Sequence, residues 1–168
     1  MKLSNIKKYN FQYFLILISI IILFIFSTGC ENTQVFCKRV IISAMPEKIF
    51  KVITDFESYP KLCPEFYKQV NIVSNIKEGK GVIIENVSEF KGYSQRSRWE
   101  VIEYEKDKLI RLENPSFGTI IIIVNQIDYN TSEEIMIVVT KISSTMKDEV
   151  FSVYEKQMKA VKEKCERM

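Results

Sequence analysis

The sequence predicts an α+β domain in which an antiparallel sheet of about seven strands packs on a long C-terminal helix, with a membrane segment ahead of this domain. Three observations carry the prediction. Short apolar, β-branched runs alternate with turns in the middle of the chain, as in antiparallel sheets. Residues 147–167 repeat apolar side chains at helical spacing, and residues 9–30 contain no charge. The 168 residues, 46% of them hydrophobic, suit one domain with a sizeable core.

The folded part begins with a strand, predicted over residues 36–43. Pro46 then indicates the first turn of a helix, because the amide that proline lacks would have no partner at that position. Apolar residues recur every three or four positions after it, which predicts one buried helix face. We expect a second, very short helix with Ser58 as its N-cap, ended near Pro64.

Six further strands follow, separated by short turns. They are predicted over residues 70–75, 82–90, 93–104, 108–113, 118–127 and 135–142. Five consecutive apolar residues, Ile120 to Val124, indicate a strand that is buried on both faces. The last element, over residues 147–167, is an amphipathic helix of about 30 Å at the usual rise per residue. Its apolar stripe consists of Val150, Phe151, Tyr154, Met158, Val161 and Cys165.

The chain therefore divides into three parts. Residues 1–30 are predicted to be a signal or membrane-anchor segment, residues 31–35 a polar linker, and residues 36–168 the folded domain. The uncharged stretch follows an acid-free start that carries three lysines, which is typical of export signals and membrane anchors.

Two interpretations of the N-terminal segment stay open, and both tether the domain to a membrane. In one, Ser27-Thr28-Gly29-Cys30 resembles the small-small-Gly-Cys end of a bacterial lipobox, which implies cleavage before Cys30 and lipid on its sulfur. In the other, the segment stays as a helix, since about 20 apolar residues span the hydrocarbon core. Lysines before the segment outnumber the Lys and Arg soon after it, so we expect the domain on the extracytoplasmic side.

Composition excludes several classes of function. Beyond residue 30, the chain carries 21 Lys and Arg against 21 Asp and Glu, and this neutral balance argues against a nucleic-acid partner. The chain has no histidine and no Cys-x-x-Cys pair among its four cysteines, so we expect no zinc site, no cofactor and no imidazole catalysis. One disulfide among Cys37, Cys63 and Cys165 and three free thiols both stay open.

Short motifs within this order of elements resemble a known family. Residues 43–50, SAMPEKIF, are similar to the apolar-Pro-Glu-x-apolar-Phe helix start of the START-like superfamily, in its polyketide cyclase/dehydrase and coenzyme Q-binding branch. Residues 55–60, DFESYP, resemble its Asp-x-x-x-Tyr-Pro turn, and residues 98–104 its mid-sheet strand. The resemblance covers about residues 36–166 and implies the helix-grip fold, a curved sheet around the C-terminal helix. Members bind lipids, quinones, sterols or aromatic polyketides between sheet and helix, and a few catalyse cyclisation.

Such a cavity implies which side chains would meet a hydrophobic ligand. The apolar candidates, each equally suited to an ordinary core, are Phe66, Val70, Trp99, Val101, Ile121, Val138, Tyr154 and Met158. Arg96 and Arg98 share one face of their strand and would hold a carboxylate or phosphate head group if that face points inwards. On a solvated outer face they would have no such role, and Tyr93 and Gln95 on the opposite face are then the alternative.

Three functions stay open. The favoured one is a membrane-tethered binding or carrier domain for a hydrophobic ligand such as a lipid, isoprenoid or quinone. The second is a non-catalytic interaction domain whose cavity is filled by its own side chains. The third is a cyclase/dehydrase-type enzyme, whose acid-base candidates without histidine reduce to Tyr93, Glu100, Tyr104 and Tyr154. No motif assigns any of these four as catalytic, and the sequence indicates no particular protein partner.

Overall fold

The computed structural model describes residues 33–90 and 92–168, which form an antiparallel sheet with helices on one face. The sheet has seven strands in the order β1-β7-β6-β5-β4-β3-β2. The predicted α+β architecture and the helix-grip arrangement are confirmed. The predicted membrane segment and Cys30 lie outside the described residues. Among the helices that the structure does describe, none has the length and hydrophobicity needed to cross a membrane.

The chain enters the sheet through β1 (Thr33–Ile42) and leaves it for the helix α2 (Pro46–Thr54). Pro46 is the first residue of α2, as predicted, and at that position the amide that proline lacks would have no partner within the helix. A single 3-10 turn, η1 (Phe56–Ser58), and the short helix α3 (Tyr59–Leu62) follow. Ser58 occupies the N-cap position of α3 as predicted, but its hydroxyl donates to the carbonyl oxygen of Asp55 at 2.9 Å and caps no helix amide.

The other six strands form the rest of the sheet by antiparallel pairing of spatial neighbours. They are β2 (Tyr67–Ile72), β3 (Ile83–Phe90), β4 (Tyr93–Glu105), β5 (Leu109–Asn114), β6 (Gly118–Asp128) and β7 (Thr131–Lys141). β1 pairs with β7 along its whole length, so the first and last strands of the chain lie side by side. β1 and β2 are the two edges of the sheet.

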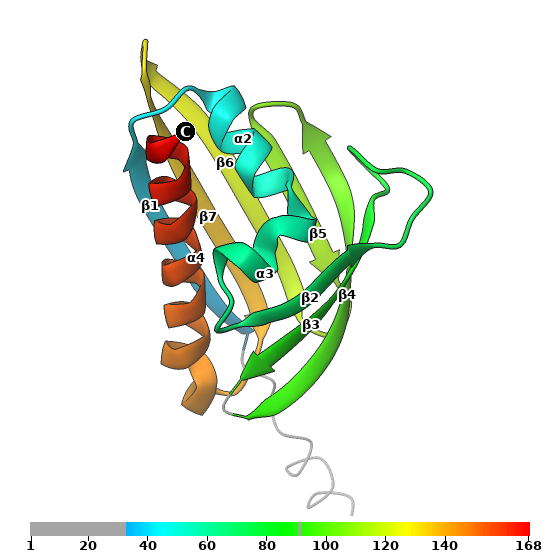
Figure 1. The fold of residues 1–168 in the computed structure, drawn as a ribbon. Coiled ribbons are helices and arrows are strands. Elements are labelled where there is room, and N and C mark those ends of the chain that lie inside the picture. Colours follow the sequence, from blue (N-terminus) through cyan, green and yellow to red (C-terminus); the bar gives the residue numbers. More distant parts are fainter. Residues whose placement is uncertain (1–32, 91) are drawn as a thin grey trace, which may run out of the picture. The chain divides into compact units, whose positions relative to one another are not determined.

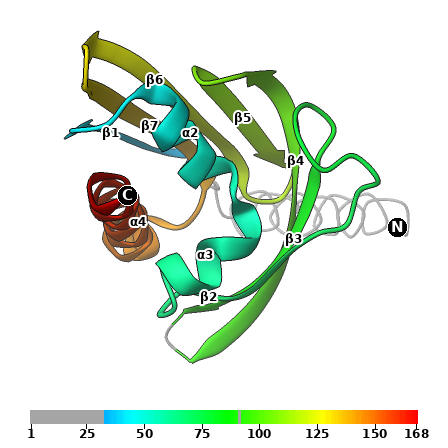
Figure 2. The ribbon, with the colours of Figure 1, turned by 45° about the horizontal axis from the view of Figure 1, so that its top comes forward.

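The long helix α4 (Lys147–Arg167) follows a 3-10 turn, η2 (Ser144–Met146), and lies on the concave face of the sheet (Figures 1 and 2). The helices α2 and α3 lie on the same face and contact α4. Two bonds fix the C-terminal end of α4 to the end of β1. The Glu166 carboxylate accepts the Ser43 amide at 3.0 Å, and the Lys162 ammonium donates to the carbonyl oxygen of Ile41 at 2.6 Å.

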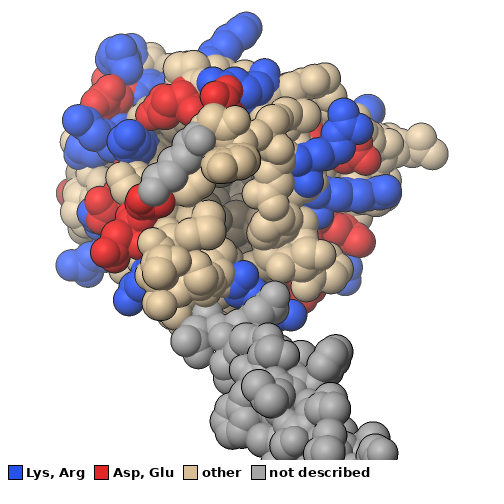
Figure 3. Space-filling view, turned by 90° about the horizontal axis from the view of Figure 1, so that it is seen from below, with Lys and Arg blue, Asp and Glu red and all other residues tan. Residues whose placement is uncertain are grey.

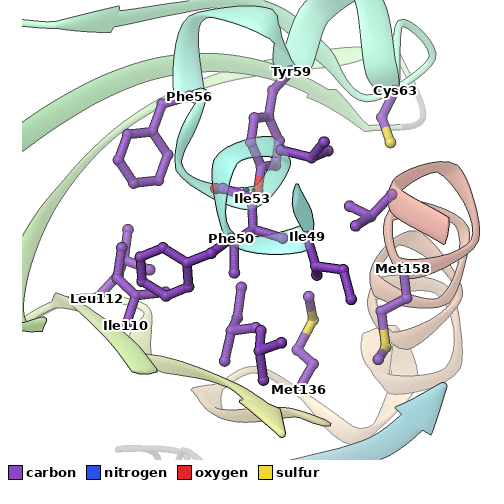
Figure 4. Close-up of a cluster of buried hydrophobic side chains, with 14 of the residues drawn as sticks. Ile49, Phe50, Ile53, Phe56, Tyr59, Cys63, Ile110, Leu112, Met136 and Met158 are labelled. Atoms are coloured by element: carbon purple, nitrogen blue, oxygen red, sulfur yellow. Dashed lines mark hydrogen bonds between the residues drawn. The ribbon is translucent and has the colours of Figure 1, made fainter. Parts of the chain in front are cut away.

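The densest part of the core lies beneath α2 (Figure 4). Ile49, Phe50 and Ile53 of α2 point into it and are almost fully buried. They meet side chains from β5, β7 and α4, which include Ile110, Leu112, Met136 and Met158. Large apolar side chains therefore fill this part of the space between sheet and helices.

The outer face of the sheet differs from the prediction for Ile120 to Val124. Ile122 and Val124 are buried on the inner face, whereas Ile121 and Ile123 are only half-buried on the outer face. No described element covers that outer face, and neighbouring side chains from β5 and β7 shield these isoleucines in part. The prediction of burial on both faces is therefore wrong. The described cysteines, Cys37, Cys63 and Cys165, are all free thiols.

Candidate functional site

A cavity of about 430 Å³ lies between the sheet and the N-terminal half of α4. Its volume falls within the range of about 300–1,000 Å³ that is usual for small-molecule sites. Its walls are formed by Ile53, Phe56, Tyr59, Phe66, Tyr67, Val70, Ile84, Asn86, Ser88, Phe90, Gln95, Ser97, Trp99, Leu112, Phe117, Ile120, Ile122, Thr140, Lys141, Ile142, Ser143, Met146, Val150, Val153, Tyr154 and Gln157. Figure 3 views the end of the fold where β7 leads into α4, and shows a hollow with mostly uncharged residues around it.

Small polar side chains explain why this space is not filled. In the register of β3 and β4, Asn86 pairs with Ser97 and Ser88 with Gln95, and all four residues line the cavity. Ser and Asn are too short to reach across to α4, so they leave open the gap that large side chains close beneath α2.

The polar wall is organised by a chain of hydrogen bonds that starts at Trp99. Its indole Nε1 donates to the Ser97 Oγ at 3.0 Å. The Ser97 hydroxyl donates in turn to the Asn86 Oδ1 at 2.6 Å. The three side chains come from two neighbouring strands and hold one another in fixed orientations on the cavity wall.

A second polar group lies where α3, β2 and α4 meet. The Tyr67 hydroxyl donates to the Gln157 Oε1 at 3.1 Å, and the Gln157 Nε2 donates to the Tyr59 hydroxyl at 3.5 Å. The Tyr59 hydroxyl itself donates to the carbonyl oxygen of Ile53 at 2.9 Å. Gln157 is buried, and these bonds give both its amide oxygen and its amide nitrogen a partner inside the protein.

The tyrosines of the cavity keep their protons at neutral pH. Burial raises the pKa of Tyr154 to about 12. Burial also raises the pKa values of Tyr59 and Tyr67 well above their ordinary value, and in Tyr59 the nearby Glu134 adds to the effect. All three hydroxyls are therefore hydrogen-bond donors in this cavity and are poorly suited to accept a proton as a general base.

The cavity offers little charge to a ligand. Of the described residues that line it, Lys141 is the one with a charged side chain, and that residue is exposed. No cluster of three His, Cys, Asp or Glu side chains with a metal-binding arrangement occurs among residues 33–90 and 92–168. The arrangement can enclose an apolar molecule and hydrogen-bond to a neutral polar group on it.

Four of the predicted lining residues do line the cavity: Phe66, Val70, Trp99 and Tyr154. Their role in binding a ligand stays a prediction. Val101, Val138 and Met158 are buried in the core and do not line this cavity. Val101 borders a separate surface pocket that is lined by charged residues and by Tyr104.

The other four candidates do not line the cavity, and for Arg96 and Arg98 the structure selects the solvated outer face, one of the two alternatives. Arg96 and Arg98 are exposed on the outer face of β4, because Ser97 and Trp99 occupy the inner face and side chains alternate along a strand. Ile121 lies on the outer face of β6, because its neighbour Ile122 is buried on the inner face and side chains alternate along the strand. Tyr93 is 79% exposed at the start of β4 and does not line the cavity. Gln95, which was predicted together with Tyr93 as the alternative to the arginines, does line it.

Sequence reasoning missed Asn86, Ser97, Tyr67 and Gln157. Ser97 was within reach, because it shares the strand face of Trp99 at a spacing of two residues. Asn86 follows from Ser97 only when the β3–β4 register is known. Gln157 interrupts the apolar stripe of α4, and its partners come from distant parts of the chain.

Comparison with known families decides the classification. The family described as polyketide cyclase/dehydrase and lipid transport matches residues 33–125, which is more than half of the chain. The chain belongs to this family. The polyketide cyclase/dehydrase and lipid transport family contains both cyclising enzymes and lipid carriers by its description, so membership alone does not choose between them. A search of curated protein sequences finds no match to the chain.

Solved structures share the fold of this polyketide cyclase/dehydrase and lipid transport family member at low sequence identity. A START superfamily protein from Mycobacterium smegmatis is 16% identical with a TM-score of 0.66, over 81% of this chain and 99% of that one. A protein from Thermus thermophilus is 15% identical with a TM-score of 0.65, over 79% and 97%. Norcoclaurine synthase from Thalictrum flavum, solved with dopamine and hydroxybenzaldehyde, is 13% identical with a TM-score of 0.60, over 79% and 86%. These similarities establish the START-like helix-grip fold.

Proposed function

We propose that the protein is a membrane-tethered binding or carrier domain for a hydrophobic ligand such as a lipid, isoprenoid or quinone. The observation that carries the proposal is the cavity of about 430 Å³ beneath α4, with its mainly apolar walls. An apolar molecule that enters it gains about 25 cal/mol for each Å² of apolar surface removed from water.

The membrane tether is supported by the sequence. Residues 9–30 contain no charge and follow an acid-free start that carries three lysines, a pattern that is typical of export signals and membrane anchors. Either interpretation of this segment, a lipidated Cys30 or a retained helix, would hold the domain at a membrane.

The alternatives have less support. Of the four acid-base candidates, Tyr154 lines the cavity, whereas Glu100 and Tyr93 are exposed and Tyr104 borders the separate charged pocket. Burial raises the pKa of Tyr154, so this hydroxyl also holds its proton at neutral pH. An interaction domain with a filled cavity conflicts with the open space beneath α4.

The proposal predicts that the full chain is found in carbonate-washed membranes and carries a bound apolar molecule. Native mass spectrometry of the chain released from lipid nanodiscs would then show an added mass of one defined ligand. Ser97→Phe places a ring in the cavity and should abolish the added mass, while Arg98→Phe, on the opposite face of β4, should retain it. A chain that is released by carbonate, or that never carries a ligand, would contradict the proposal.

A further inference from the structure

The short distance between Ser97 and Asn86 defines which end of the Asn86 amide faces Ser97. An indole N–H can only donate, so the Ser97 Oγ is an acceptor of the Trp99 Nε1. The separation of 2.6 Å between Ser97 and Asn86 is typical of an O–H···O bond and shorter than the usual N–H···O distance of about 2.9 Å. The Ser97 hydrogen therefore points to the Asn86 Oδ1, and the amide NH₂ is turned away from Ser97.

The Asn86 NH₂ group is left as a donor on the cavity wall. Asn86 is half-buried and lines the cavity, and its Nδ2 makes no hydrogen bond to any residue that the structure describes. Its neighbours on the inner face of these strands include Ile84 and Trp99, which contribute mainly apolar surface. If an apolar ligand covers this NH₂ group and offers no acceptor, the group loses its hydrogen bonds to water, and this loss costs free energy. A ligand with an acceptor oxygen at this position avoids that cost.

We propose that the Asn86 amide is a specificity-determining donor that binds a carbonyl oxygen of the ligand, so that the ligand is an apolar ketone, ester or quinone. Ser97 is a positioning residue, because it acts on the ligand only through the orientation of Asn86. This inference rests on the proposed function and adds the chemical class of the ligand to it.

The surroundings of Asn86 disfavour the other oxygen-bearing ligands. A carboxylate placed there would lose its hydration without a cation beside it, since the one charged lining residue, Lys141, is exposed at the end of β7. An alcohol would bring a hydrogen that also needs an acceptor, and one of the two lone pairs of the Asn86 Oδ1 already accepts from Ser97. A carbonyl oxygen accepts without donating and matches the free NH₂ group.

The test compares four probes with one carbon skeleton: tridecane, 2-tridecanone, 2-tridecanol and tridecanoate. Trp99 is the only tryptophan of the chain and lines the cavity, so its emission should shift to shorter wavelength as a probe replaces water. The full chain in lipid nanodiscs is titrated with each probe. Partition of a probe into the lipid cancels when its affinity is compared between variants.

We expect the wild-type chain to bind 2-tridecanone roughly 3- to 10-fold more tightly than Asn86→Leu does, as one neutral hydrogen bond implies. Tridecane should bind both chains equally well. Asn86→Asp keeps the shape of the side chain but removes the donor, so it should lose the same ketone affinity as Asn86→Leu. Agreement between the two variants shows that the loss does not come from a folding defect of Asn86→Leu. Ser97→Ala should lose part of the ketone affinity. Asn71→Leu, a change at an exposed position of β2, should lose none of it.

Three outcomes would overturn the inference. One is an equal loss of ketone and hydrocarbon binding in Asn86→Leu, and another is an unchanged ketone affinity in both Asn86 variants. The third is a loss of tridecanoate affinity in Asn86→Leu that equals or exceeds the loss of ketone affinity. In each of these cases the cavity still binds apolar molecules, so the proposed function survives. If none of the four probes changes the emission of Trp99, the proposed function fails together with the inference.

Discussion

Glu134 is the most unusual single residue of the core. It is fully buried on the inner face of β7, where it pairs with Val40 and Val124 of the neighbouring strands. Neither carboxylate oxygen has a hydrogen-bond partner among the described residues. Burial raises the pKa of Glu134 to about 8, so the carboxyl is mainly protonated at neutral pH. Tyr59 and Cys165 lie close enough to feel its charge, and burial keeps both of them protonated over the same pH range.

The Glu134 pKa predicts a pH dependence of stability. Between the ordinary value of 4.5 and about 8 the folded state holds a proton that the unfolded state releases, so the free energy of unfolding falls as pH rises. The fall should be about 1.4 kcal/mol per pH unit within this window. Urea unfolding at pH 5 and pH 8 measures it. Glu134→Gln should remove most of the fall, and the exposed control Glu113→Gln should not. An identical pH dependence in both variants would show that Glu134 is not the cause.

At the residue scale, the sequence predicted mainly the apolar side chains of the site. Trp99 and Tyr154 were identified because aromatic residues on predicted inner faces meet either a core or a ligand. Arg96 and Arg98 were assigned on charge, and alternation with Trp99 places them outside. Asn86 and Gln157 gain their meaning from partners across the sheet and across the fold, and no local pattern contains that information.

At the scale of elements, α4 performs two different tasks along its length. Its C-terminal half buries Met158, Val161 and Cys165 in the core. Its N-terminal half presents Val150 and Val153 to the cavity, where they remain partly accessible. The same amphipathic stripe therefore stabilises the fold at one end of the helix and forms a wall of the candidate site at the other.

This division predicts unequal costs for the same truncation. Val161→Ala removes two fully packed methyl groups and should lower the free energy of unfolding by roughly 2 kcal/mol. Val153→Ala removes methyl groups that already border open space, and should cost less than about 1 kcal/mol. Urea unfolding followed by circular dichroism provides both values. Equal losses would mean that the space beneath the start of α4 is as well packed as the core.

The boundaries of the elements were largely predictable, for identifiable reasons. The helix α4 spans residues 147–167 as predicted, because its period is long and uninterrupted. The strand β7 begins at Thr131, four residues before its predicted start. Polar residues open that strand, and their pairing with β1 and β6 holds them in the sheet.

At the scale of the molecule, the fold combines a packed end and an open end. Large apolar side chains beneath α2 fill the space between sheet and helices, and small polar ones on β3 and β4 leave it open. The predicted order of the elements and the short motifs at residues 43–50 and 55–60 predicted the helix-grip fold, and the sheet order confirms it. The location and polarity of the cavity depend on which side chains face one another across the fold, so they required the structure.

The central claim is that this open end binds an apolar ligand, and the indole N–H resonance of Trp99 tests it most directly. Because the chain has one tryptophan, a ¹⁵N-labelled sample in nanodiscs gives one such resonance, from a group that donates to Ser97 on the cavity wall. Addition of 2-tridecanone should move this resonance saturably in the wild-type chain and in Arg98→Phe, but not in Ser97→Phe. A resonance that stays unchanged at saturating ketone, or that moves equally in all three chains, would contradict binding in the cavity.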